Sequence, residues 1–407
     1  MRTRQSFEDS RSSPRGPRPA EREDVRVGII GIGMTAFRPA TPEYNWKELM
    51  FEAASRAYAD ADVDPRTDVD SFITCAEDYY EGFGIFDEFV PDQLGAALRP
   101  TCTVSGDGLQ GLANAFMQIE TGLVDVAVVE AHSKASDIVT LEGVIEHALD
   151  PVWNKPLGAH PFVIAGLEAD AYLRATKTPR RALAAVVRKN RQNALTNPLA
   201  AYAAKIEIDE VLGSDERFAP LRSLDIANPA DGCVVLVLAS ETAATKLHAN
   251  PVWIRGVGWA SDSPSLETRD WAGGEYARLA AAMAYRLAKI RRPSTEIDLA
   301  EVDDRFSFKE LLHLEALGLA KKGEAGKRAL RGDYGADGSL PVNVSGGSLG
   351  CGNVFEATGL HRAAEVALQL RGDAGMHQVD GVQVGVAQSW RFVPSATGAV
   401  AVLGVGR

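Results

Sequence analysis

The same order of strand and helix patterns occurs twice in this chain of 407 residues, and this repeat constrains the fold more than any other feature. In each half a glycine-containing apolar run comes first, a glycine-rich turn then opens a helix pattern, and a second apolar run follows. The paired segments are VRVGIIGIG and VWIRGVG, LQGLANAFMQIETG and TGLHRAAEVALQLRG, and DVAVVEAHS and GVQVGVAQS. The first run lacks polar alternation, which is typical of a covered, parallel-type sheet. We therefore expect two duplicated α/β units packed together, with functional loops at strand-to-helix turns.

The repeat also predicts the domain organisation. A chain of this length exceeds the usual single core, so two fused halves are expected. We place the N-terminal half at 25–250, with an insertion at 134–222, and the C-terminal half at 251–407. Residues 1–24 are polar and have no apolar period, so they are predicted to form a disordered tail.

Charge and cysteine content exclude several classes of protein. The net charge of −12 argues against a nucleic-acid or anionic-membrane surface. No run of eighteen apolar residues occurs, so we expect no membrane span. The four cysteines form no CxxC pair. They are expected to be reduced thiols in a cytoplasmic protein without a metal site.

Two glycine-rich turns are the candidate functional loops. PVNVSGGSLGCGNVFEATG (341–359) predicts a strand, a loop and a helix, and its loop glycines would offer free N–H groups to an oxygen or an anion. In TCTVSGDGLQG (101–111), helical spacing begins after Ser105, which places this serine on the N-cap side of a helix. If the halves are duplicated, Ser105 and Asn353 occupy equivalent turns that face each other.

Five motifs in order resemble the thiolase superfamily, in particular its sterol-carrier (lipid-transfer) type and its archaeal branch. They are VSGDG before a helix, NALTNP, DDRF, NVSGGSLGCGNVFEATG and TGAVAVLG. The resemblance implies a duplicated five-layered αβαβα fold, coenzyme A thioesters as substrates, no permanently bound cofactor, and a tight homodimer. It also implies a small OB-fold accessory protein with a zinc ribbon as a partner.

The chain departs from the family at its catalytic positions. Ser105 stands where such thiolases carry the nucleophilic cysteine, and Asn353 stands where they carry a histidine. Asp303 and Asp304 replace an Asn-Glu or His-Asp pair, and QSWRFVPSATG contains no second cysteine. Transfer through an enzyme thioester needs an activated nucleophile. Cys102 is an alternative thiol, and Cys351 is expected to be a small buried cysteine.

A retro-aldol cleavage of a β-hydroxyacyl thioester needs only a base and donors that hold an enolate. Asp303 is the predicted base, with its pKa raised by burial beside Asp304, and Asn353 is the predicted donor. Both aspartates could instead cap the next helix or pair with Arg305. Thiolase-fold proteins that cleave steroid side chains also lack the cysteine and use tyrosines.

Further candidates come from loops and one helix. They are Tyr79, Tyr80 and Tyr334 as substitutes for the aldolase tyrosines; His160 as a pocket imidazole; Gly346, Gly347 and Gly352 as anion-binding positions; and Arg188 and Arg191 as partners for coenzyme A phosphates. Three functions stay open: an acyl-CoA lyase of aldolase type, an acyltransferase that uses Ser105 or Cys102, and a non-catalytic subunit of a thiolase-like complex.

Overall fold

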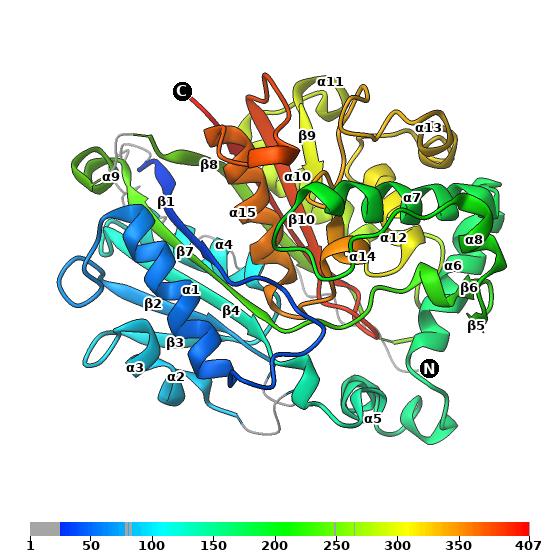
Figure 1. Ribbon diagram of the computed structural model, residues 1–407, viewed down its shortest axis with the longest axis horizontal. Helices are drawn as coiled ribbons and strands as arrows, with labels where there is room; N and C mark the ends of the chain where they lie inside the picture. The colour runs from blue at the N-terminus through cyan, green and yellow to red at the C-terminus, as the bar shows by residue number, and fades with distance from the viewer. Residues whose placement is uncertain (1–24, 78–79, 81–83, 248–249, 264, 407) are drawn as a thin grey trace, which may run out of the picture.

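The computed structural model describes residues 25–406 apart from 78–79, 81–83, 248–249 and 264. The predicted tail, 1–24, and Tyr79 lie outside the described residues. The main sheet has nine strands in the order β3-β2-β4-β7-β1-β8-β11-β10-β9 (Figure 1). Their bounds are β1 Val27–Met34, β2 Ser71–Cys75, β3 Thr101–Val104, β4 Val126–Ser133, β7 Gly232–Ser240, β8 Val252–Ser261, β9 Leu299–Glu301, β10 Val384–Trp390 and β11 Thr397–Gly404.

The strand order repeats between the two halves. In the N-terminal half the third, second, fourth, fifth and first strands lie side by side as β3-β2-β4-β7-β1. The C-terminal half has the same order, because a parallel bridge from Val342 to Ala300 of β9 takes the place of its third strand. The expectation of a parallel-type sheet around β1 is wrong, since β1 runs antiparallel to both β7 and β8.

Helices cover both outer faces of the sheet and fill the space between its halves. α1 (Trp46–Ala61) packs on β1 and β7, and α10 (Glu275–Ala288) packs on β8 and β11. α4 (Gly108–Glu120) and α15 (Ala357–Arg371) contact each other and strands of both halves, so they form the middle layer (Figure 1). This arrangement confirms the predicted duplicated αβαβα architecture.

Glycines bring each outer helix against its strand in the same way. A Cβ on Gly33 of β1 would lie 1.9 Å from the carbonyl oxygen of Ala53 in α1. In the other half, a Cβ on Gly258 of β8 would lie 2.2 Å from the carbonyl oxygen of Ala280 in α10. The glycines of the two paired strand segments therefore serve close helix–strand packing.

The helices of the insertion lie mainly beside the C-terminal half (Figure 1). One of the helices of the insertion is α7 (Arg180–Asn193). The other helices are α2 Phe86–Phe89, α3 Pro91–Leu94, α5 Leu141–Ile145, α6 Phe162–Thr176, α8 Ile208–Gly213, α9 Glu241–Leu247, α11 Pro293–Glu296, α12 Ser307–Ala316, α13 Ala325–Arg331 and α14 Gly347–Cys351. A small hairpin joins β5 (Glu216–Phe218) to β6 (Leu221–Arg222).

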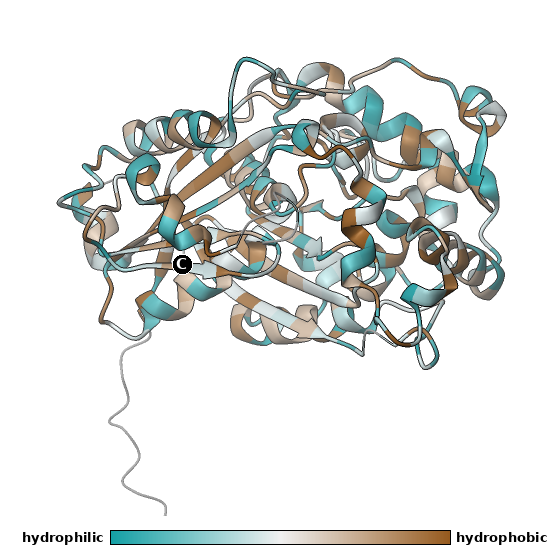
Figure 2. Cartoon of the chain, turned by 90° about the horizontal axis from the view of Figure 1, so that it is seen from below, coloured by the Kyte–Doolittle hydropathy of each residue, from teal (hydrophilic) through white to brown (hydrophobic). Residues whose placement is uncertain are grey.

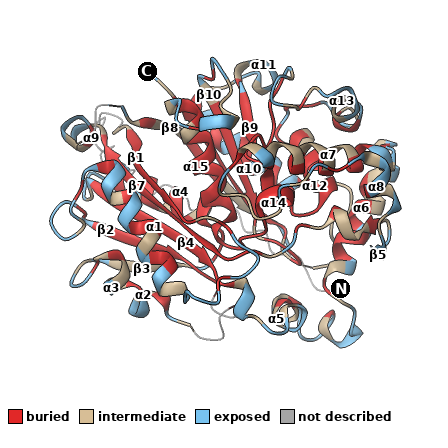
Figure 3. Cartoon of the chain, in the orientation of Figure 1, coloured by how far each residue is buried: buried red, intermediate tan, exposed pale blue. Residues whose placement is uncertain are grey.

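The core follows the sheet. Apolar residues concentrate on the strands and polar residues on the outer helices (Figure 2). Most strands of the main sheet and the middle-layer helix α15 are almost wholly buried, whereas the edge strand β3 is half-buried (Figure 3). Among the described residues, no helix is both long and apolar enough to cross a bilayer.

Candidate active site

Ser105 lies in the turn after β3, and its side chain is exposed. Asp107, and not Ser105, caps α4. Asp107 accepts a hydrogen bond from the N–H of Leu109, and the Gln110 side chain accepts one from the N–H of Asp107. This reciprocal pair is a capping box. Ser105 is therefore free of the capping role that the sequence pattern gave it, and its hydroxyl faces other groups.

Those groups are Glu77 and Arg391, which sequence reasoning missed. The Ser105 hydroxyl donates to Oε2 of Glu77 at 3.2 Å and accepts from Nη2 of Arg391 at 3.2 Å. Arg391 also donates hydrogen bonds to both carboxylate oxygens of Glu77, from Nη2 to Oε2 at 2.7 Å and from Nε to Oε1. The available signal was position, since Glu77 and Arg391 each follow the end of a buried strand.

A small cavity lies beside this cluster and holds about 10 Å³, which is room for roughly one water molecule. Both halves of the chain contribute its walls. The lining residues are Glu77, Tyr80, Gly106, Asp107, Arg305, Phe355, Glu356 and Arg391.

Asp107 is a buried carboxyl on the wall of this cavity. Its two oxygens accept hydrogen bonds from the N–H groups of Leu109 and Gly359, so it ties α4 to α15. Burial raises the pKa of Asp107 to about 6, although the charge of Arg305 and the hydrogen bonds of Leu109 and Ser389 act in the opposite direction. Asp107 is therefore mostly ionised at neutral pH and close enough to its pKa to exchange a proton.

Asp303 does not line the cavity and is paired with a cation. Its Oδ2 accepts from Nε of Arg305 at 2.9 Å, and both side chains are buried. Burial alone would raise the pKa of Asp303, but the charge and hydrogen bond of Arg305 hold it below its ordinary value. The expectation that Asp304 raises this pKa is wrong, because Arg305 is the nearer charge.

Asp304 is the anion that the C-terminal glycine loop binds. Its carboxylate accepts from the N–H groups of Ser348 and Leu349, at 2.6 and 3.1 Å, and from Arg362 at 2.6 Å. A Cβ on Gly347 would lie 2.3 Å from this carboxylate. The loop N–H groups thus serve an internal carboxylate, which corrects the expectation that they are free for a ligand.

Gly346 and Gly352 are also packed against protein. Added Cβ atoms would lie 2.6 Å from Ala194 and 2.5 Å from Ala230, respectively. Both glycines have φ above +100°, a conformation that side chains avoid. They shape the loop and do not line the cavity.

Asn353 and His160 do not line the cavity either. Oδ1 of Asn353 accepts from the N–H of Phe355 at 3.1 Å. The buried amide is therefore held two positions before Phe355, which lines the cavity. His160 accepts from the N–H of Phe162 at 3.0 Å and packs on Phe218, in the insertion. The structure does not bring His160 to Ser105.

None of the thiols lines the cavity. Cys102 lies on β3 beside a surface cavity bounded by Gln118 and Thr121, and burial and Asp87 raise its pKa. Cys351 is buried, as expected, and its Sγ contacts the carbonyl oxygen of Ser345 at 3.1 Å.

Of the candidate tyrosines, Tyr80 lines the cavity and packs on Phe355 with ring centroids 4.8 Å apart. Tyr334 is buried elsewhere, beneath the guanidinium of Arg328. Tyr80 is thus the candidate tyrosine that the structure brings to the site.

The basic residues proposed for coenzyme A lie on α7. Arg188 is exposed and pairs with Glu207 at 3.7 Å. Arg191 is mostly buried, and this burial lowers its pKa.

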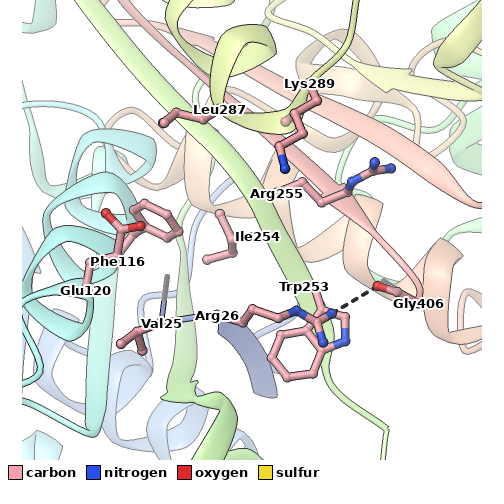
Figure 4. Close-up of a pocket in the computed structure, with 11 residues that line it drawn as sticks. Val25, Arg26, Phe116, Glu120, Trp253, Ile254, Arg255, Leu287, Lys289 and Gly406 are labelled. Atoms are coloured by element: carbon pink, nitrogen blue, oxygen red, sulfur yellow. Dashed lines mark hydrogen bonds between the residues drawn. The ribbon is translucent and has the colours of Figure 1, made fainter. Parts of the chain in front are cut away.

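A second cavity, of about 300 Å³, lies at the far end of α4 from Ser105 (Figure 4). Glu120, Trp253, Arg255 and Lys289 are among its lining residues, and Arg26 stacks over Trp253 at 3.8 Å. No predicted site residue lines this cavity.

A duplicated αβαβα fold, with its candidate site at strand ends where the two halves meet, is the architecture of thiolase-fold proteins. The chain belongs to the thiolase superfamily. A family model described as "Thiolase C-terminal domain-like" matches residues 258–404. The chain is 30% identical to the acetyl-CoA acetyltransferase of Methanothermobacter thermautotrophicus, over 89% of this chain and 95% of that protein. It is also 30% identical to sterol carrier protein 2 of Bos taurus, over 88% of this chain and 69% of that protein.

Solved structures show the same fold at lower identity. The "Ltp2-ChsH2(DUF35) aldolase" superposes with a TM-score of 0.80 at 24% identity, covering 94% of this chain and 98% of that one. Human mitochondrial 3-ketoacyl-CoA thiolase in complex with CoA superposes with a TM-score of 0.72 at 16% identity, covering 94% and 98%. These likenesses confirm the thiolase fold.

Proposed function

We propose that this protein is an acyl-CoA carbon–carbon lyase that cleaves a β-hydroxyacyl thioester by a retro-aldol reaction, without a covalent intermediate. The observation that carries the proposal is the environment of Ser105. The carboxylate that touches its hydroxyl is itself neutralised by two contacts from Arg391. A carboxylate in such a pair is a poor base, so Ser105 is not activated as a nucleophile.

The acyltransferase alternative would need another nucleophile at the cavity. Cys102 lines a different cavity at the surface, and its raised pKa keeps the thiol protonated at neutral pH. The aldolase among the structural neighbours supports the lyase alternative at the level of fold.

Retro-aldol cleavage needs one proton acceptor. We assign this role to Asp107 in place of Asp303, because Asp107 lines the cavity and has a pKa of about 6. The base takes the hydroxyl proton, and the oxygen forms a carbonyl as the Cα–Cβ bond breaks. The bond electrons move into the thioester as an enolate, which takes a proton at Cα. Asn353 is buried outside the cavity, so we do not assign it as the donor to that enolate.

A direct test compares covalent and non-covalent routes. The protein is incubated with a panel of β-hydroxyacyl-CoA and 3-oxoacyl-CoA thioesters, released products are analysed by mass spectrometry, and intact protein mass is followed. We expect cleavage of a β-hydroxyacyl-CoA into a carbonyl compound and a shorter acyl-CoA, unchanged protein mass, and activity of Ser105→Ala within a few-fold of wild type. A stable acyl adduct on Ser105 or Cys102 would favour the acyltransferase.

We also propose that a small accessory protein with an OB fold and a zinc ribbon completes the site. Four large apolar side chains near the start of the insertion support a docking surface: Val139, Val152, Trp153 and Leu157 are each at least 70% exposed. The aldolase neighbour is described as a complex with a DUF35 protein. Co-expression with the product of a neighbouring gene should raise the cleavage rate; an unchanged rate would contradict this proposal.

A further inference from the structure

The pair formed by Arg391 and Glu77 joins the two halves at the candidate site. Glu77 follows β2 in the N-terminal half and Arg391 follows β10 in the C-terminal half, 314 positions later. Arg391 therefore stands beside Ser105, at the position of the family's nucleophile, and brings a permanent positive charge there.

Exposure differs sharply between the two partners. The side chain of Glu77 is 4% exposed and that of Arg391 is 34% exposed. The N–H of Glu77 also donates to the carboxylate of Glu356 at 2.9 Å, which holds its backbone in place. The carboxylate is thus a fixed, buried anchor, and the guanidinium is the part of the pair that a substrate can reach.

We propose that Arg391 is a catalytic residue that binds the thioester oxygen and stabilises the enolate, and that Glu77 is a positioning residue that holds Arg391. This role rests on the proposed lyase function. Negative charge develops on the thioester oxygen when the Cα–Cβ bond breaks, and a preorganised cation beside that oxygen favours this state over the neutral thioester. A planar guanidinium held by two contacts loses little freedom when it binds this oxygen.

The pair could also act only as a clamp between the halves, and the test must separate these two roles. The last step of the cleavage is protonation of an enolate at Cα, so the same site must run this step backwards on the product. Deuterium incorporation at Cα of acetyl-, butanoyl- and octanoyl-CoA in D₂O therefore measures enolate formation directly.

We expect wild-type protein to catalyse this exchange and Arg391→Ala to lose it by on the order of 10²–10³-fold, the scale for removal of an oxyanion donor. Added guanidinium chloride at non-denaturing concentration should restore about tenfold of the loss in Arg391→Ala. It should not help Glu77→Ala, in which the arginine is present but unanchored. Arg286→Ala, on the exposed face of α10, is the matched control and should exchange at the wild-type rate.

The outcomes are distinct. Exchange by Arg391→Ala at the wild-type rate overturns the role of Arg391 and leaves the lyase function intact. Loss of exchange with a lowered melting temperature and no rescue by guanidinium shows a clamp only, and also overturns it. No exchange by wild-type protein, together with no cleavage of any β-hydroxyacyl-CoA, overturns the lyase function and the catalytic role with it.

Discussion

At the scale of single residues, Asp107 combines a structural and a chemical role. It caps α4 and accepts the N–H of Gly359, yet it also lines the cavity with a pKa raised to about 6 by burial. Asparagine caps helices about as well as aspartate, so one substitution keeps the cap and removes the base, although it also loses the acceptor for the N–H of Gly359.

The first prediction concerns the pH dependence of cleavage. A base must be deprotonated to act, so kcat/KM should rise with pH up to about 6 and level off above it. Asp107→Asn should lower kcat by on the order of 10² or more and abolish this acid limb. The variant loses the acceptor for the N–H of Gly359, so its melting temperature should fall by the loss of about one buried hydrogen bond while the protein stays folded. Steady-state rates between pH 4.5 and pH 8, read with thermal unfolding, test it; an unchanged acid limb in the variant would assign the base elsewhere.

The second prediction concerns Asp303 and stability. Asp303→Asn leaves the buried guanidinium of Arg305 without a counter-charge and should cost about 3–5 kcal/mol of unfolding free energy. Asp209→Asn removes an exposed partner of Arg181 and should cost less than about 1 kcal/mol. Urea denaturation of both variants measures these losses, and equal losses of unfolding free energy in the two variants would contradict the prediction.

Acid should weaken the same ion pair. The pKa of folded Asp303 is below its ordinary value of 3.8, so its contribution is complete above about pH 4 and is lost as pH falls through the folded pKa. The stability difference between wild type and Asp303→Asn should therefore narrow in acid.

At the scale of elements, backbone approach sets the layers. α1 packs on glycines of β1, and α10 packs on glycines of β8. At these glycines a helix carbonyl oxygen occupies the space that a Cβ atom would need. Interiors are close-packed, so an added methyl there must displace a whole helix.

The third prediction follows from this packing. Gly258→Ala should destabilise the protein by about 3 kcal/mol or more, because the new Cβ would meet the Ala280 carbonyl oxygen at 2.2 Å. Gly213→Ala is the control, since no atom lies within 4 Å of its Cβ position. Denaturation curves showing similar stability for both variants would disprove the packing argument.

At the scale of the whole molecule, the candidate site exists only where the halves meet. Glu77, Ser105 and Asp107 come from one half, and Arg305, Phe355 and Arg391 come from the other. The outer strand β3 borders a surface cavity that includes Cys102 and Leu123.

The fourth prediction is a homodimer that forms through this edge. Sedimentation at micromolar concentration should give twice the chain mass, and Leu123→Lys should shift the protein toward monomer. Leu123 is 89% exposed, and placing a charge at an apolar interface disfavours association. Met376→Lys, at a site 78% exposed in the other half, is the control. A stable wild-type monomer would refute the prediction.

Repeats and periodicity were enough to predict two packed α/β units, and the resemblance to the thiolase superfamily implied their five-layered order. The paired apolar segments are β1 and β8, and β4 and β10, which hold corresponding positions in the repeated strand order. Whether neighbouring strands run parallel or antiparallel was not predictable, because a continuous apolar run occurs in both types of sheet. The site was only partly predictable. Ser105 could be located by motif order, but Glu77 and Arg391 meet across 314 positions and no local pattern marks such a pair.

The two borders of the nine-stranded sheet are unequal, and this limits how copies can join. Beyond β9 the backbone at Val342 already bridges to Ala300, whereas β3 pairs on one side only within the described chain. A sheet with one open border can be extended once. When two copies pair through β3, the unpaired amide and carbonyl groups of both β3 strands become hydrogen-bonded. Assembly then stops at a closed two-fold dimer, because a head-to-tail filament would need a second open edge on each copy.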